Sequence, residues 1–135
     1  MRTWIALLIL TSAAAAAHAY APETNYTLHC QGCHLADGTA SADKVPALAG
    51  SVARFLVAAE GRAFLVRVPG VANAQLADAD LAALLDWTLR RFDAANLPAE
   101  FVPYTAEEVR RLRAEPLVDV ARERRRLLDA IERER

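Results

Sequence analysis

From residue 20 onward, hydrophobic and polar residues recur with the period of about 3.6 residues that is typical of an α-helix, and proline and glycine interrupt the pattern. The strongest segment is 78–93. Its apolar positions follow the spacing i, i+3, i+4, i+7 and i+8 and form one stripe that should face a core: Leu81, Leu84, Leu85, Thr88 and Leu89. Trp87 and Phe92 add large apolar area beside the stripe. The pattern therefore predicts an all-α protein.

Shorter helices are predicted on both sides of a glycine-containing loop that spans residues 37–50. One starts at Glu23, and two further pieces cover 51–57 and 61–68. A proline-glycine pair follows, and it should end the last piece, because proline is disfavoured inside a helix and glycine tolerates a turn.

The C-terminal segment, residues 98–135, predicts two more helices. Thr105 is the expected N-cap of the first, and Glu108 is expected to reach back in a capping box. The second covers 117–134 and has an apolar stripe that Arg124 interrupts: Leu117, Val120, Ala121, Leu128 and Ile131. Two interpretations are open. The helices either pack back on the preceding domain, or form a docking arm for a partner or a second copy.

Residues 1–19 are typical of a secretory signal peptide. Arg2 is followed by an apolar run over 4–10 and by small residues that end in the cleavage pattern Ala17-His18-Ala19. A retained membrane anchor is the alternative, but a spanning helix needs about 20 apolar residues and the strong hydrophobicity fades into alanines. We expect cleavage before Tyr20 and a periplasmic protein without a stable membrane span.

Length and charge indicate one domain that does not bind nucleic acid. The chain has 135 residues, and from residue 20 its 15 Lys and Arg against 17 Asp and Glu give 15 − 17 = −2. A basic face would be expected for phosphate binding, but the nine arginines of residues 98–135 are interleaved with nine acidic residues.

Residues 30–34 read Cys-Gln-Gly-Cys-His, the C-x-x-C-H pattern of covalent haem attachment. Two thiols at this spacing can form thioethers with the two vinyl groups of one haem, and the histidine can coordinate the iron. Thioredoxin-like sites also use C-x-x-C, but their βαβ pattern is missing here. Zinc is disfavoured because both cysteines lie with His29 and His34 within six consecutive residues, too crowded to enclose a tetrahedral ion. A disulfide between Cys30 and Cys33 remains the alternative to one covalent haem c.

The chain resembles the class I c-type cytochromes over roughly residues 20–93. It shares the C-x-x-C-H motif, the aromatic Tyr26 four residues before it, and the motif P-x-L-x-G that begins at Pro46. The resemblance implies that the Pro46 carbonyl accepts a hydrogen bond from the second ring nitrogen of the proximal ligand His34. It also implies a contact between Arg54 and a haem propionate. Ordinary roles as a loop proline and a solvated arginine stay open for Pro46 and Arg54.

The implied organisation is a signal peptide over 1–19, a cytochrome c-like haem domain over 20–97 and a two-helix extension over 98–135. Pro22 replaces a small glycine that normally lets the first and last helices approach closely, so the first helix should be short or shifted.

The family's axial methionine is missing, since Met1 is the single methionine of the sequence. The loop that should carry it, residues 68–75, offers Asn73 or Gln75 as weak amide ligands. The alternative role for Asn73 is to satisfy backbone groups in the loop. We expect the sixth coordination position of the iron, which the family's methionine would occupy, to be open or weakly ligated.

Two functions follow from the resemblance. The first is a periplasmic carrier that passes single electrons between redox proteins such as a dehydrogenase and a terminal acceptor. The second is the binding or sensing of a diatomic ligand at an open iron. No distal histidine or arginine is evident for peroxide cleavage, so at most weak peroxidase-like activity is expected and the protein should not be an enzyme.

Overall fold

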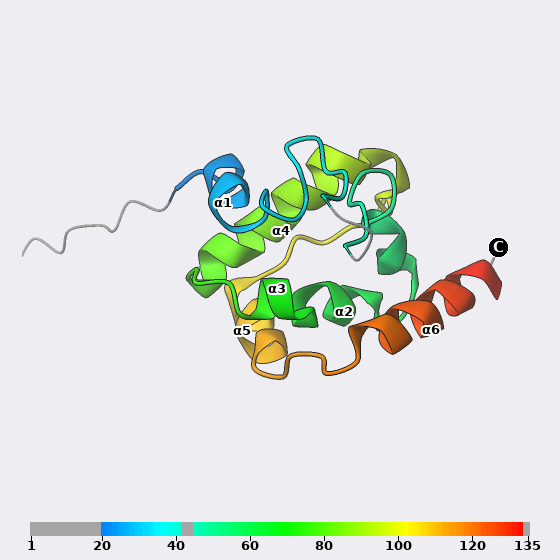
Figure 1. The fold of residues 1–135 in the computed structure, drawn as a ribbon. Coiled ribbons are helices and arrows are strands. Elements are labelled where there is room, and N and C mark those ends of the chain that lie inside the picture. The colour runs from blue at the N-terminus through cyan, green and yellow to red at the C-terminus, as the bar shows by residue number, and fades with distance from the viewer. Residues whose placement is uncertain (1–19, 42–44, 134–135) are drawn as a thin grey trace, which may run out of the picture.

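A computed structural model describes residues 20–41 and 45–133, and this part of the chain is helical, with no strand and one isolated bridge between His34 and Ala40. The predicted all-α class is therefore confirmed. Figure 1 shows the arrangement. In chain order the elements are α1 Pro22–His29, the 3₁₀-helix η1 Ala53–Val57, α2 Gly61–Arg67, α3 Pro69–Ala72, α4 Asp78–Asp93, the 3₁₀-helix η2 Ala94–Asn96, α5 Ala106–Arg113 and α6 Val120–Arg133.

The predicted signal peptide over residues 1–19 lies outside the described residues. Among the residues described, none of the helices combines the length and the apolar character that a membrane crossing requires.

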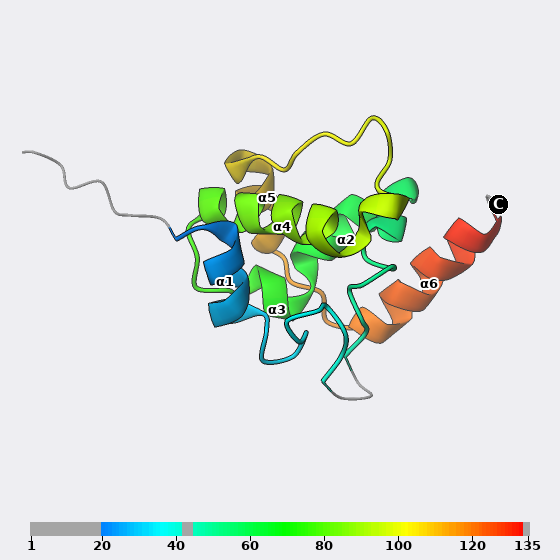
Figure 2. The same ribbon diagram turned by 90° about the horizontal axis from the view of Figure 1, so that it is seen from above.

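Helix α4 is the centre of the fold, and both α1 and α5 pack against it (Figure 2). Its first turn carries Asp78 and Asp80 and its last turn Arg90 and Arg91, so the charges complement the helix dipole at both ends. Four of the five predicted stripe residues are buried, and Thr88 is half-buried. The period of the apolar residues thus predicted both the helix and its buried face.

Aromatic packing joins α1 to α4. The ring centroid of Tyr26 lies 5.3 Å from that of Trp87 and 5.0 Å from that of Phe92. Helix α1 begins at Pro22, where proline fits because the first helical N–H needs no partner. It is only 8 residues long, as the proline predicted.

The loop before α4 contains an element that the sequence pattern did not predict. The proline-glycine pair does end α2, but Pro69 also starts the one-turn helix α3, with Val68 as its N-cap. Proline is favoured at the first helical position for the same reason that it breaks a helix interior. Residues 68–76 therefore form a short helix followed by a turn.

Gly61 lets α2 begin directly against η1. Gly61 is buried, and a Cβ atom at this position would lie 1.7 Å from the carbonyl oxygen of Phe55. The close approach places the rings of Phe55 and Phe64 in a stacked arrangement with centroids 5.0 Å apart. Glycine is required here because the contact is with backbone, which cannot rotate away.

The C-terminal helices pack on the rest of the molecule, in agreement with the first of the two interpretations. Helix α5 contacts α4, α2 and α3, and α6 contacts η1 and α2. Their buried residues, Val109, Leu127 and Ile131, join the same hydrophobic cluster as α4, and so does Tyr104, which precedes α5. The predicted stripe of α6 was wrong at Ala121, which is exposed, and it missed Leu127. Arg124 interrupts that stripe because its guanidinium lies over the Phe55 ring, 5.8 Å from the centroid.

The predicted capping box is half formed. The backbone N–H of Glu108 donates to the Thr105 hydroxyl oxygen at 3.1 Å, as expected. The Glu108 carboxylate does not reach back, because Arg62 of α2 binds it at 2.6 Å and 2.7 Å. The Arg62 guanidinium also lies 3.9 Å from the centroid of the Tyr104 ring. A bidentate ion pair is a stronger partner than a single exposed N–H, so it ties α5 to α2.

Candidate haem site

The C-x-x-C-H segment forms a tight turn at the end of α1. The N–H of Cys30 donates to the Tyr26 carbonyl at 2.8 Å, and those of Cys33 and His34 donate to the Cys30 carbonyl at 3.1 Å and 2.9 Å. Cys30 is half-buried, Cys33 is exposed, and both thiols are free. Burial and the neighbouring Cys33 raise the pKa of Cys30 to about 11, so its thiol stays protonated at neutral pH. The structure thus brings together the two predicted attachment residues and the predicted ligand.

Tyr26 fixes the backbone at His34. Its hydroxyl donates to the His34 carbonyl oxygen, and the Leu35 carbonyl oxygen lies 2.8 Å away. Burial is the main reason why the pKa of Tyr26 rises to about 12, which keeps the hydroxyl a donor. The sequence predicted only the packing role of Tyr26. The hydroxyl could have indicated a hydrogen-bonding role from the sequence, since phenylalanine would be sufficient for packing alone.

His34 has an unpartnered nitrogen. Its Nδ1 is buried and makes no hydrogen bond to residues of 20–41 or 45–133. Burial lowers the pKa of His34, and the nearby backbone of Pro46 raises it by less, so the imidazole is neutral at pH 7. Neutral imidazole is the form that ligates iron. Pro46 therefore lies beside His34, but the predicted Nδ1 hydrogen bond is not formed here, and its role stays a prediction.

Arg54 has a second unpartnered nitrogen. Its Nε is buried without a hydrogen bond to any described residue. Arg54 belongs to η1, which is held to α4 by the preceding residue: the N–H of Ala53 donates to the buried carboxylate of Asp93 at 2.7 Å. A buried guanidinium N–H without a partner suits an anionic group such as a propionate. The free thiols, the neutral imidazole of His34 and the buried Arg54 Nε fit a haem with a histidine ligand and a carboxylate edge.

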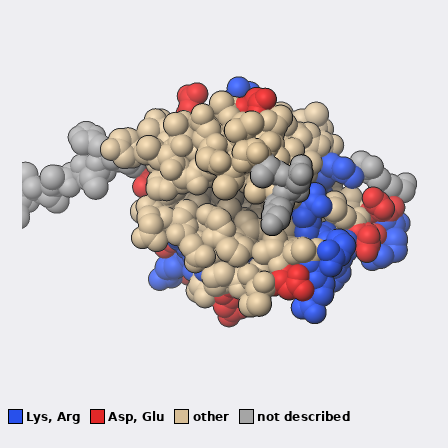
Figure 3. All heavy atoms as spheres, viewed as in Figure 1, with Lys and Arg blue, Asp and Glu red and all other residues tan. Residues whose placement is uncertain are grey.

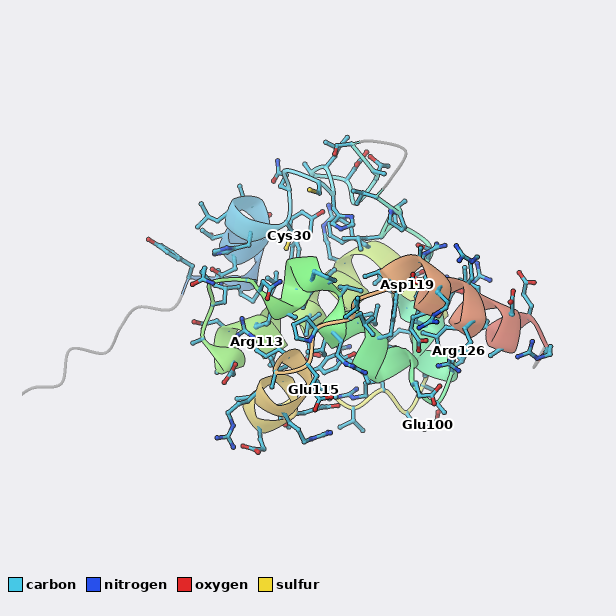
Figure 4. The ribbon with its side chains drawn as sticks, turned by 60° about the horizontal axis from the view of Figure 1, so that its bottom comes forward. Cys30, Glu100, Arg113, Glu115, Asp119 and Arg126 are labelled. Atoms are coloured by element: carbon cyan, nitrogen blue, oxygen red, sulfur yellow. The ribbon has the colours of Figure 1, made fainter. Side chains whose placement is uncertain are left out.

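The surface between the haem motif and α3 is hollowed, as Figure 3 shows. Three segments without Asp, Glu, Lys or Arg border this face in the view of Figure 1: residues 24–36, 45–53 and 68–77. In Figure 4, the Cys30 side chain points from the end of α1 toward α3. The motif and the loop 68–76 therefore face each other across the hollow, and most of the visible face around it is uncharged (Figure 3).

The candidate sixth ligand is in the exposed part of this loop. Asn73 is the exposed C-cap of α3, and its N–H donates to the Pro69 carbonyl at 3.1 Å. The amide nitrogen of Gln75 donates to the Asn73 carbonyl oxygen at 3.1 Å. Both residues take part in the internal hydrogen bonds of the loop, and iron ligation by Asn73 stays a prediction.

Arg113 of α5 is the residue of this region that sequence reasoning missed. It donates to the carbonyl oxygens of the loop before α4, and no sequence signal could have indicated this. Three of its four partners are main-chain carbonyl oxygens more than thirty residues away, and a carbonyl oxygen is present at every position of a chain.

No family model matches the chain. Similar curated proteins include a cytochrome c-552 from Thermus thermophilus, which is 34% identical over 146 aligned positions that cover 93% of this chain and 97% of that protein. Another cytochrome c-552 from Thermus thermophilus is 35% identical over 118 positions, covering 73% of this chain and 90% of its own length. Because the first alignment takes in 93% of the chain, it includes most of the C-terminal extension as well as the C-x-x-C-H segment.

Proposed function

The chain belongs to the c-type cytochromes, and from this premise we propose that it is a mono-haem electron carrier of the periplasm. Its partners would be a periplasmic donor such as a dehydrogenase and a terminal acceptor. The observation that carries the proposal is the turn of Cys30, Cys33 and His34, which lies in a structure where the buried Arg54 Nε has no partner among the described residues.

Each residue of the site has a distinct part in holding the group. Cys30 and Cys33 would form the two thioethers, His34 would ligate the iron, and Pro46 would orient the imidazole once it accepts from Nδ1. Arg54 would bind a propionate through its free Nε. The bound haem would supply one-electron chemistry between ferric and ferrous iron. The hydroxyl of Tyr26 would keep the ligand loop in place.

The proposal is tested by expressing the full chain with a haem-attachment system and measuring its mass and reversible reduction. Covalent haem and a single one-electron wave are expected. A chain in which Cys30 and Cys33 form a disulfide and no haem is attached would contradict the proposal.

A second candidate function is the binding of a diatomic ligand at an open iron. The favouring observation is the loop 68–76, which contains no methionine, cysteine, histidine or lysine. The optical and EPR spectra of the ferric protein separate the candidates. A high-spin spectrum that shifts on adding NO favours ligand binding, whereas a low-spin spectrum with a strong second ligand excludes the open site.

Replacing Arg54 by glutamine should lower the midpoint potential of the bound haem. A guanidinium at a propionate favours the reduced state, which carries one positive charge less. We expect a decrease of roughly 30–60 mV, which corresponds to at most about a tenfold change in the equilibrium constant of a one-electron reduction. Potentiometric titration measures it, and Arg111→Gln on the exposed surface of α5 is the control. Equal potentials in both variants would remove Arg54 from the haem site.

A further inference from the structure

The loop 68–76 has no charged side chain of its own and lies opposite the C-x-x-C-H segment across the hollow (Figure 3). Its internal backbone hydrogen bonds are all local. In the turn of α3, the N–H groups of Val71 and Ala72 donate to the Val68 carbonyl, and that of Asn73 donates to the Pro69 carbonyl. Beyond α3, the N–H of Ala74 donates to the Val71 carbonyl at 3.1 Å and the N–H of Leu76 donates to the Ala74 carbonyl at 2.9 Å. Among the described residues, no backbone N–H donates to the carbonyl oxygens of Ala72 and Leu76, so these two groups need other donors.

One side chain supplies these donors. The guanidinium of Arg113 donates from Nε to the Ala72 carbonyl at 3.0 Å and from Nη1 to the Leu76 carbonyl at 2.9 Å, and from Nη2 to the Ala74 carbonyl. Nη1 also lies 3.1 Å from the Asp78 carboxylate, and the Arg113 side chain is only 17% exposed. Figure 4 shows Arg113 where α5 meets this loop. The rigid fork of arginine can satisfy three carbonyls at once, which a lysine ammonium on a flexible stem cannot do with the same geometry.

The segment after Arg113 holds the other end of the loop. Arg67, the last residue of α2, donates from Nε to the Glu115 carbonyl at 2.7 Å, and its own carbonyl accepts from the N–H of Leu117 at 2.8 Å. Residues 113–117 therefore bind the chain just before the loop and just after it. The loop is fixed at both ends by the C-terminal extension.

We infer that Arg113 is a positioning residue for the sixth-ligand side of the haem iron, and that by binding the carbonyls of Ala72, Ala74 and Leu76 it restricts the access of exogenous ligands. The inference rests on the proposed haem function, because the loop has a haem to cover only if one is attached to Cys30 and Cys33. The C-terminal extension is thereby part of the haem site, although it contributes no iron ligand.

The test uses the full-length, haem-loaded protein and the variants Arg113→Ala and Arg113→Lys. The control is Arg110→Ala on the same helix, because Arg110 is exposed and its ion pair is with Glu107 of α5. Hydrogen–deuterium exchange at Ala74 and Leu76 reports loop order, and the rate of cyanide association with the ferric protein reports access to the iron.

Both Arg113 variants should raise the exchange rate in the loop and the cyanide association rate by about tenfold or more, because several charge-assisted hydrogen bonds are lost together. Arg110→Ala should change neither. Arg113→Lys keeps the charge opposite Asp78, so it remains informative if Arg113→Ala does not fold.

Unchanged exchange and cyanide association in haem-loaded Arg113→Lys would overturn the inference and leave the proposed function intact. Exchange that rises equally over the whole chain would also overturn it, because the effect would then be general destabilisation. Wild-type protein that attaches no haem would instead refute the proposed function, and the inference with it.

Discussion

In His34→Ala, the amount of bound haem per chain is expected to be at least about tenfold lower than in the wild type, because the variant lacks the side chain that ligates the iron next to the C-x-x-C-H motif. The two thiols would remain in the same turn, so any haem still attached should be high-spin. Added imidazole should enter the space left by the side chain and restore much of the wild-type absorption. Haem content by mass spectrometry and the optical spectrum measure both effects.

His29→Ala is the matched control for this prediction. His29 is the last residue of α1, adjacent to Cys30 and exposed, so its loss should leave haem content and spectrum unchanged. Equal haem content and equal spectra in the two variants would show that His34 is not the ligand. A loss of haem in His29→Ala alone would show that His29, and not His34, ligates the iron.

Gly61→Ala is expected to produce the largest loss of stability among the five possible glycine-to-alanine substitutions of this chain. The new Cβ would lie 1.7 Å from the Phe55 carbonyl oxygen, so η1 and α2 must move apart and the Phe55–Phe64 stack must separate. We expect roughly 3–5 kcal/mol of destabilisation, which is a large part of the 5–15 kcal/mol that typical domains have. Urea unfolding followed by circular dichroism measures the free energy of unfolding.

Gly70→Ala separates this steric effect from the general effect of replacing glycine. Gly70 lies in α3, its φ is not positive, and a Cβ there meets nothing within 4 Å. Alanine reduces the freedom of the unfolded chain, so this variant should be neutral or slightly more stable. A similar loss of stability at both positions would contradict the proposed clash at Gly61.

The sequence predicted best where one physical cause determined the structure. The stripe of α4 follows from the helical period and the need to bury one face, and both were correct. Helix α3 was missed because Pro69 was treated only as a helix breaker, although proline also favours the first helical position. In α6 the apolar stripe was placed one residue away from the buried residue Leu127, since Arg124 disturbed the pattern and its stacking on Phe55 depends on tertiary structure.

Contacts of the candidate site between residues close in sequence could be predicted, and contacts with the backbone of residues far away in sequence could not. Cys30, Cys33 and His34 lie in one turn, so their proximity follows from the motif itself. The choice of Glu108 between its own helix end and Arg62 depends on how α5 packs against α2. The contacts of Arg113 depend on the path of a loop, which no pattern of side chains specifies.

The uncharged segments around the hollow have a kinetic consequence for the encounter with a redox partner. Electrostatic steering raises association rates by orders of magnitude, but it requires complementary charges near the contact. Of the described residues, the segments 24–36, 45–53 and 68–77 offer none, so collisions through them should occur at the unsteered rate of about 10⁵–10⁶ per molar per second and depend little on salt. Rapid turnover would then require a high local concentration of the two proteins, as in a confined compartment or a partner held at the membrane surface.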